Sequence, residues 1–263
     1  MSNTFKSKPQ ILFILLAGFF IVNAIVAEFI GIKIFSLEKT LGFDPVSINL
    51  LGQTGLSFNL TAGVLLWPVV FIMTDLINEY YGPKAIRFLS WLTVGLIIYA
   101  FIMVFTAIST TPNEWWNLES GKLDPNPVNH LSSMNLAFKK VMGQGLWIIF
   151  GSVIAFLVGQ VLDVFIFHRI KKVTGEGRIW LRATGSTLIS QFIDSYVVLI
   201  IAFYIGSDWE LSRVLAIGTV NYIYKFFMAF LLTPVIYWVH ALIENYLGHE
   251  QAQVLKNQAM GNE

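Results

Sequence analysis

The sequence contains no cysteine and few charged residues, and each shortage excludes classes of protein. Without cysteine there is no disulfide bond, thiolate metal site, iron–sulfur cluster or cysteine nucleophile. Charged residues make up only 13% of the 263 residues, too few for the surface of a soluble protein. The net charge of +1 offers no basic surface for nucleic acid, so no such partner is expected. A phosphate-binding ATPase loop is also missing, and the sequence predicts no cofactor and no metal site.

Hydrophobic residues dominate instead, at 56% of the chain with a mean hydropathy of +0.67. A helix needs about 20 apolar residues to cross a bilayer, and the long apolar runs lack the two-residue alternation of barrel strands. We therefore expect an all-α integral membrane protein, a bundle of six transmembrane helices in a single transmembrane domain (1–263). The expected spans are 11–32, 58–80, 88–109, 146–167, 184–205 and 214–242.

The distribution of lysine and arginine predicts the orientation, because cytoplasmic loops carry more of these residues. With six spans, both termini lie on the same side of the membrane, and the basic residues of that side outnumber those opposite. We expect both termini in the cytoplasm. The basic residues within 169–172 are expected to fix this topology, with binding of anionic lipid headgroups as a second interpretation.

A hydrophilic stretch, residues 110–144, separates the third and fourth spans. Its apolar residues recur at helical spacing, at Val128, Leu131, Met134, Phe138 and Val141. This spacing predicts a short helix lying at the membrane interface. A connector packed against the bundle is the alternative.

Polar side chains inside the spans are the strongest functional signal, because such residues usually face a cavity or a partner. Offsets of three, four and seven residues place those of one helix on a shared face. They predict one cavity between spans two, four, five and six, surrounded by Asp75, Asn78, Glu79, Gln160, Asp163, Gln191, Asp194, Asn221 and Lys225. The competing interpretation is structural, with interhelical hydrogen bonds and a buried ion pair between an aspartate and Lys225.

Two weaker signals lie outside this cluster, a proline and a histidine–glutamate pair. Pro68 is expected to kink the second span by removing a backbone hydrogen bond. His240 and Glu244 have the spacing of metal ligands, although a solvated helix end is the simpler interpretation.

Three stretches of the spans form a recognisable combination. They are Thr74-Asp75-Leu76-Ile77-Asn78-Glu79-Tyr80-Tyr81-Gly82, Gly159-Gln160-Val161-Leu162-Asp163 and Gln191-Phe192-Ile193-Asp194. Together they resemble the bacterial queuosine precursor transporter family, formerly called vitamin uptake transporters. The resemblance implies six transmembrane helices in the inner membrane and import of 7-deazaguanines such as preQ0 and preQ1, which serve tRNA modification. A homodimer is one arrangement that we consider.

The chemistry of such a substrate suits the polar cluster. One carboxylate can accept both the N1 proton and the 2-amino group of a guanine-like ring, and a second can neutralise the cationic arm of preQ1. The amides of Gln160, Gln191 and Asn221 could satisfy the remaining ring edges. Phe192 and Tyr222 are candidates to stack on the ring, with packing as the alternative.

Two rival functions use the same residues. One is the substrate-binding subunit of an ATP-driven vitamin or nucleobase importer, which would need a separate ATPase. The other is an intramembrane enzyme, with Asp163 and Asp194 as an aspartic dyad or Asp75 and Glu79 holding Mg²⁺. The glycines expected around the second aspartate of such a dyad are missing, so we expect no enzyme activity.

Overall fold

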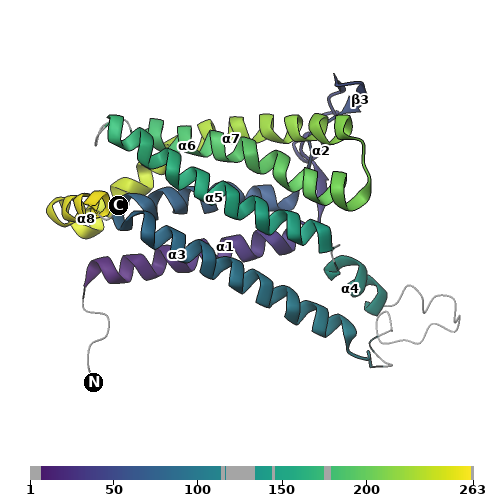
Figure 1. The fold of residues 1–263 in the computed structure, drawn as a ribbon, viewed down its shortest axis with the longest axis horizontal. Coiled ribbons are helices and arrows are strands. Elements are labelled where there is room, and N and C mark those ends of the chain that lie inside the picture. Colours follow the sequence, from purple (N-terminus) through teal and green to yellow (C-terminus); the bar gives the residue numbers. More distant parts are fainter. Residues whose placement is uncertain (1–6, 114–115, 117–133, 144–145, 175–178, 262–263) are drawn as a thin grey trace, which may run out of the picture.

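The structure is a computed structural model that describes residues 7–113, 116, 134–143, 146–174 and 179–261. Five helical stretches of the described chain are long and apolar enough to cross a membrane. They comprise α1 (Lys8–Ile30), α3 (Trp67–Ser109), α5 (Leu146–Thr174), α6 (Ile179–Leu199) with its π-helical continuation η4 (Ile200–Ile205), and α7 (Leu211–Leu247). Figure 1 shows these helices packed in one bundle.

The α3 helix is folded back on itself at Gly82, whose φ of 81° and ψ of 176° break the helix. The Tyr81 hydroxyl donates to the carbonyl of Pro9 at the start of α1, whereas Phe101 contacts Phe29 near the end of α1. The segments before and after Gly82 therefore run in opposite directions along α1. This hairpin is compatible with six membrane crossings, and their number stays a prediction.

The expected helical start of the second span at Phe58 is wrong. Residues 59–61 instead form strand β4 (Asn59–Thr61), and the 3₁₀ turn η1 (Ala62–Leu65) precedes α3. The backbone of this segment bonds to the chain after α1, with Ala62 N–H donating to Lys33 O. Pro68 lies in the first turn of α3, where no intrahelical donor is needed, so it starts the helix rather than kinking it.

Two small antiparallel sheets lie at one end of the bundle, which we call the cap end. They pair β1 (Ile34–Ser36) with β4, and β2 (Ile48–Leu50) with β3 (Gln53–Leu56), and the turn α2 (Leu37–Thr40) follows β1. Glu38 accepts hydrogen bonds from the Phe58 N–H and the Ser36 hydroxyl. The hydropathy pattern did not reveal these sheets.

The opposite end of the bundle carries both ends of the described chain (Figure 1), and we call it the termini end. Lys8, at the start of α1, donates to the carbonyl of Tyr246, close to the end of α7. A final helix, α8 (His249–Gly261), packs over the α3 hairpin, and the backbone of Ala259 lies against Gly82. The hydropathy pattern does not predict this helix.

The expected interfacial helix is present in part. α4 (Met134–Met142) has no buried residue and lies at the cap end, at the side of the bundle. The earlier part of the expected stretch, from Val128, lies outside the described residues.

Apolar side chains fill the bundle and also cover its outside. Phe20, Leu76 and Ile86 are fully or almost fully buried, whereas Trp91 and Phe227 are 65% and 67% exposed. Large apolar side chains exposed in this number would be unfavourable in water but suit a lipid environment. The protein is an all-α, multi-pass membrane protein.

Candidate functional site

Polar residues of three helices line a narrow cavity in the middle of the bundle. Its walls come from α3, α6 and α7 and include Asp75, Gln191 and Lys225. The side chains of Trp67 and Thr187 also belong to its lining. Its volume is about 40 Å³, far below the roughly 300–1,000 Å³ of small-molecule sites. In this conformation the narrow cavity has no room for a bicyclic base.

A wide cavity of about 410 Å³ lies toward the cap end, a volume within the range of small-molecule sites. Asp194, Asn221 and Lys225 line it, together with Glu28 of α1 and Ser152 of α5. The Ser152 hydroxyl donates to the Glu28 carboxylate. Two carboxylates and two ammonium groups, those of Lys140 and Lys225, therefore face the same space.

An ion pair lies where the two cavities adjoin. The Lys225 ammonium contacts the Asp194 carboxylate at 2.5 Å, and the two side chains are 14% and 20% exposed. Lys225 and Trp67 line both cavities. The pair joins α6 to α7, so a movement of either helix would change the connection between the cavities.

Two more predicted residues lie beside the narrow cavity without lining it. The Gln160 side-chain oxygen accepts hydrogen bonds from Thr74 at 3.1 Å and Ser90 at 3.5 Å, and so joins α5 to both arms of the α3 hairpin. The Asp163 Oδ1 accepts from Ser190 at 3.2 Å and from the cavity residue Thr187 at 3.4 Å. One hydroxyl therefore separates Asp163 from the cavity.

Several buried polar atoms of the predicted cluster have no hydrogen-bond partner within the described chain. They are Asn78 Nδ2, Gln160 Nε2, Asp163 Oδ2, Gln191 Oε1 and Asn221 Oδ1. An unsatisfied buried donor or acceptor costs about 1–3 kcal/mol. Water or a polar solute in the bundle would recover that free energy.

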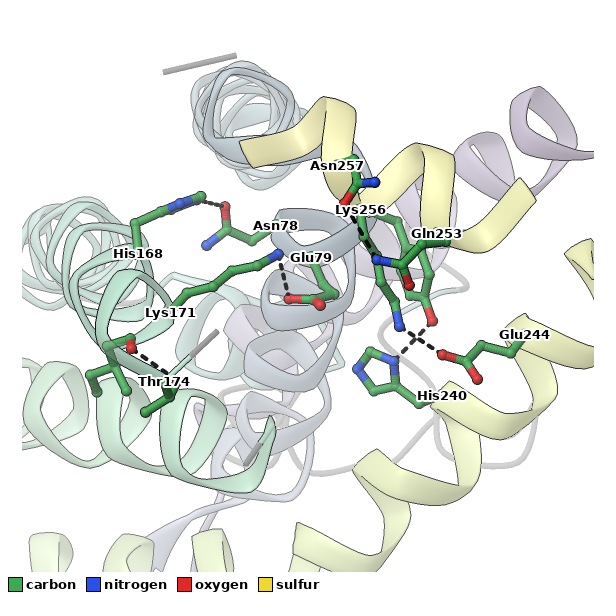
Figure 2. Close-up of polar contacts among 12 residues, drawn as sticks. Asn78, Glu79, His168, Lys171, Thr174, His240, Glu244, Gln253, Lys256 and Asn257 are labelled. Atoms are coloured by element: carbon green, nitrogen blue, oxygen red, sulfur yellow. Dashed lines mark hydrogen bonds and ion pairs between the residues drawn. The ribbon is translucent and has the colours of Figure 1, made fainter. Parts of the chain in front are cut away.

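The remaining two predicted residues pair with α5 near the termini end (Figure 2). Asn78 Oδ1 lies 2.7 Å from His168 Nε2, and the Lys171 ammonium donates to Glu79 at 3.0 Å. All four side chains are buried, and neither Asn78 nor Glu79 lines either cavity. Their geometry is that of contacts joining α3 to α5.

A second polar network in Figure 2 involves the pair considered as metal ligands. His240 Nδ1 is 2.9 Å from the Tyr80 hydroxyl, and Lys256 of α8 donates to Glu244 at 2.7 Å. The two side chains thus have separate protein partners. No group of three or more potential metal ligands occurs among the described residues.

Sequence reasoning missed several residues of the cavities, among them Glu28 and Trp67. Glu28 is an ionisable residue within the first expected span, so the rule that selected the other acids would also have selected it. Trp67 carries no comparable signal, because one aromatic among many apolar residues is usually packing. The rings of Phe192 and Tyr222 pack on each other, 5.1 Å apart, and line neither cavity. Trp67 is the better candidate to stack on a ring.

These features define a class of protein. A helical membrane bundle with cavities on both sides of a central ion pair is suited to passing a polar solute through the bilayer. Comparisons with known proteins agree. A family described as "Putative vitamin uptake transporter" matches residues 61–239, more than half of the chain. The matched region contains every lining residue of the narrow cavity. It also contains the lining residues of the wide cavity, except those within 27–34.

Curated relatives point the same way. The "Probable queuosine precursor transporter" of Bacillus subtilis is 30% identical over 213 residues, 78% of this chain and 83% of the relative. The Haemophilus influenzae protein of the same name is 26% identical, covering 67% and 66%, and the "Queuosine precursor transporter" of Escherichia coli is 27% identical, covering 69% of each. No solved structure is significantly similar. The chain belongs to this family of membrane transporters, and its relatives are named as transporters rather than enzymes.

Proposed function

We propose that this chain imports queuosine precursors, 7-deazaguanines such as preQ0 and preQ1, across the inner membrane, with both termini in the cytoplasm. The names of the relatives support the substrate class. The observation that carries the proposal is the Asp194–Lys225 ion pair between two cavities. A homodimer stays a prediction.

The ion pair is complementary to one edge of a guanine-like ring. That edge presents a carbonyl oxygen, the N1 proton and the 2-amino group in a row. The Asp194 carboxylate would accept from the two donors, and the Lys225 ammonium would donate to the carbonyl. A substrate that bonds to both the carboxylate and the ammonium group would replace the contact between them. Substrate binding would therefore also open the ion pair.

The other cavity residues would complete the site around this edge. Glu28 would neutralise the aminomethyl arm of preQ1 from the wide cavity, and Asn221 would bond a ring nitrogen there. Trp67 would stack on the ring. Asp75 and Gln191, in the narrow cavity, would receive the substrate after it passes the ion pair.

The unequal cavity volumes suggest the direction of access. The wide cavity at the cap end has a volume of about 410 Å³ against about 40 Å³ for the narrow one. With the termini in the cytoplasm, the wider of the two cavities lies toward the outside. Import then requires a rearrangement of α6 and α7 that widens the narrow cavity while the wide one closes.

Uptake by cells tests this function. The cells should lack both their own transporter and their own synthesis of queuosine precursors, so that queuosine in tRNA reports import. We expect expression of the chain to restore queuosine when preQ0 or preQ1 is supplied. Robust uptake of a vitamin or nucleoside, with no uptake of either deazaguanine or of free queuine, would refute the assignment.

Purified protein in liposomes separates this proposal from the ATP-driven importer. We expect entry of labelled preQ1 without any ATPase. Transport that appears only after a copurifying ATPase and ATP are added would instead identify the chain as a substrate-binding subunit.

A further inference from the structure

A third cavity, distinct from the two that meet at Lys225, opens between the second arm of α3 and α5 near the termini end. Its volume is about 460 Å³. Its lining residues are Pro83, Arg87, Val161, Val164, Phe165, His168, Arg169 and Lys172. None of them is acidic, and three are permanently charged cations. We call it the basic pocket.

Local contacts orient the cations of the basic pocket. Arg87 Nε donates to the Pro83 carbonyl at 3.3 Å, and the Arg169 guanidinium lies 5.1 Å from the centre of the Phe165 ring. Arg87, Arg169 and Lys172 are all exposed. The carboxylate nearest along α3, Glu79, is buried and engaged with Lys171, so it does not face the pocket.

The other wall of the basic pocket is apolar and exposed. It consists of Val161 and Phe165 of α5, which are 57% and 56% exposed and point outward from the bundle. The pocket therefore has cations at the level of the helix ends and an apolar surface running toward the membrane interior. A molecule that fits both parts carries an anionic head and hydrocarbon chains.

We propose that the basic pocket binds the phosphate of an anionic phospholipid headgroup, with the acyl chains along Val161 and Phe165. Phosphate suits this site because guanidinium groups donate paired hydrogen bonds to its oxygens. Clusters of cations between transmembrane helices at a membrane surface attract anionic lipids. This proposal depends only on the charge and shape of the basic pocket, which lies outside the proposed transport path. It is therefore independent of the proposed substrate.

Native mass spectrometry of the purified full chain in detergent tests the proposal. Phosphatidylglycerol is the probe, zwitterionic phosphatidylethanolamine is the comparison, and inorganic phosphate tests for a soluble ligand. We expect phosphatidylglycerol to bind preferentially and millimolar phosphate not to displace it. Equal binding of the two lipids, or displacement by phosphate, would overturn the assignment to a lipid.

The variant R87Q/R169Q/K172Q removes the three cations. Each cation near an anionic headgroup contributes roughly fivefold to affinity, so we expect the triple variant to bind phosphatidylglycerol on the order of a hundredfold more weakly. The matched control, K33Q/K39Q/K84Q, removes the same charge at exposed lysines outside the pocket and should bind like the wild type.

A single variant guards against misfolding of the triple variant. R169Q alone, at an exposed side chain, should weaken phosphatidylglycerol binding roughly fivefold, whereas K84Q should not. Wild-type affinity in R169Q and in the triple variant would show that the basic pocket is not the lipid site.

Discussion

Two acidic residues of the predicted cluster, Glu79 and Asp194, form ion pairs with lysines, and the two pairs differ in their access to solute. Glu79 and Lys171 are 0% and 2% exposed and line none of the three cavities described above. Asp194 and Lys225 are 20% and 14% exposed and line the wide cavity. We therefore expect the first pair to hold α3 against α5 and the second to exchange its contact for the proposed substrate.

The buried pair should behave as a structural unit. Glu79→Leu leaves the Lys171 ammonium buried without its carboxylate, which typically costs about 3–5 kcal/mol. The double variant E79L/K171M removes both charges and should lose far less stability than the sum of the single variants. Thermal unfolding in detergent measures the effect.

K84M, at an exposed lysine of α3, serves as the control and should shift stability by no more than about 0.5 kcal/mol. Full additivity of the two single variants would mean that Glu79 and Lys171 do not depend on each other.

The cavity pair should instead govern transport. Asp194→Asn keeps the side-chain shape but offers one acceptor oxygen and presents donors to the donors of the substrate. Losing a charge-assisted contact worth about 1.5–3 kcal/mol weakens binding roughly tenfold to over a hundredfold. Asp163→Asn should also reduce uptake, through its contacts with Ser190 and Thr187.

Asp208→Asn is the matched control. Asp208 is exposed and has a φ of 53°, a conformation that asparagine also tolerates. Uptake should be unchanged there, with membrane expression of all variants checked by immunoblot. Normal transport by both the Asp194 and Asp163 variants would show that these carboxylates have only structural roles.

At the scale of elements, the α3 hairpin brings two arms of one helix to Gln160. Its turn depends on Gly82, whose φ and ψ are essentially restricted to glycine. A side chain there would also meet the Ala259 carbonyl of α8 at 3.0 Å from its Cβ. The hairpin and the C-terminal helix are therefore coupled at this residue.

Gly82→Ala should destabilise the protein by about 1–3 kcal/mol from backbone strain alone. Gly95→Ala lies in the second arm of α3, where a Cβ meets nothing within 4 Å, and should cost no stability. Thermal unfolding of both variants compares them directly. Equal stability of the two variants would contradict a strained turn at Gly82.

The cap end should respond to acid through Glu38. Burial raises the pKa of this carboxyl, but hydrogen bonds from the Phe58 N–H and the Ser36 hydroxyl, among others, outweigh that effect and hold the pKa below the usual value of a glutamate. Because the folded-state pKa is lowered, the ionised Glu38 carboxylate stabilises the cap at pH values above the unfolded-state pKa. This stabilisation is lost as pH falls through the folded-state pKa.

Amide exchange over residues 34–61, corrected for the intrinsic pH dependence of exchange, should therefore show loss of protection below about pH 4.5. Glu38→Gln should show weaker protection already at pH 7 and a flatter pH response. A pH response identical to that of the wild type would show that another group controls the cap.

At the scale of the whole molecule, the start of α1 and the end of α7 lie at the same end of the bundle. The loop between η4 and α7 lies at the cap end. If the bundle crosses the membrane six times, reporters fused after Ser207 and after Met260 must lie on opposite sides.

We expect the fusion after Met260 to report the cytoplasm and the fusion after Ser207 to report the outside. Alkaline phosphatase and green fluorescent protein fusions at each position make the measurement reciprocal. Agreement between the two positions would refute the six-span topology.

Hydropathy and helical spacing determined much of the architecture from the sequence alone. The expected span 11–32 corresponds to α1, and the basic and apolar patterning predicted a helical membrane protein. These signals are local, because the cost of placing a side chain in lipid depends on that side chain rather than on its partners. The same rule identified the polar residues of the spans as a group.

Only the tertiary structure decided how those residues are distributed. Asp75 and Glu79 share a helix face in the sequence, yet one lines a cavity and the other pairs with Lys171. Spacing cannot separate such roles, because a helix face is filled by whichever neighbours the packing of the other helices brings to it. The choice of Asp194 as the partner of Lys225, and the turn at Gly82 under α8, likewise depend on contacts between segments far apart in the chain.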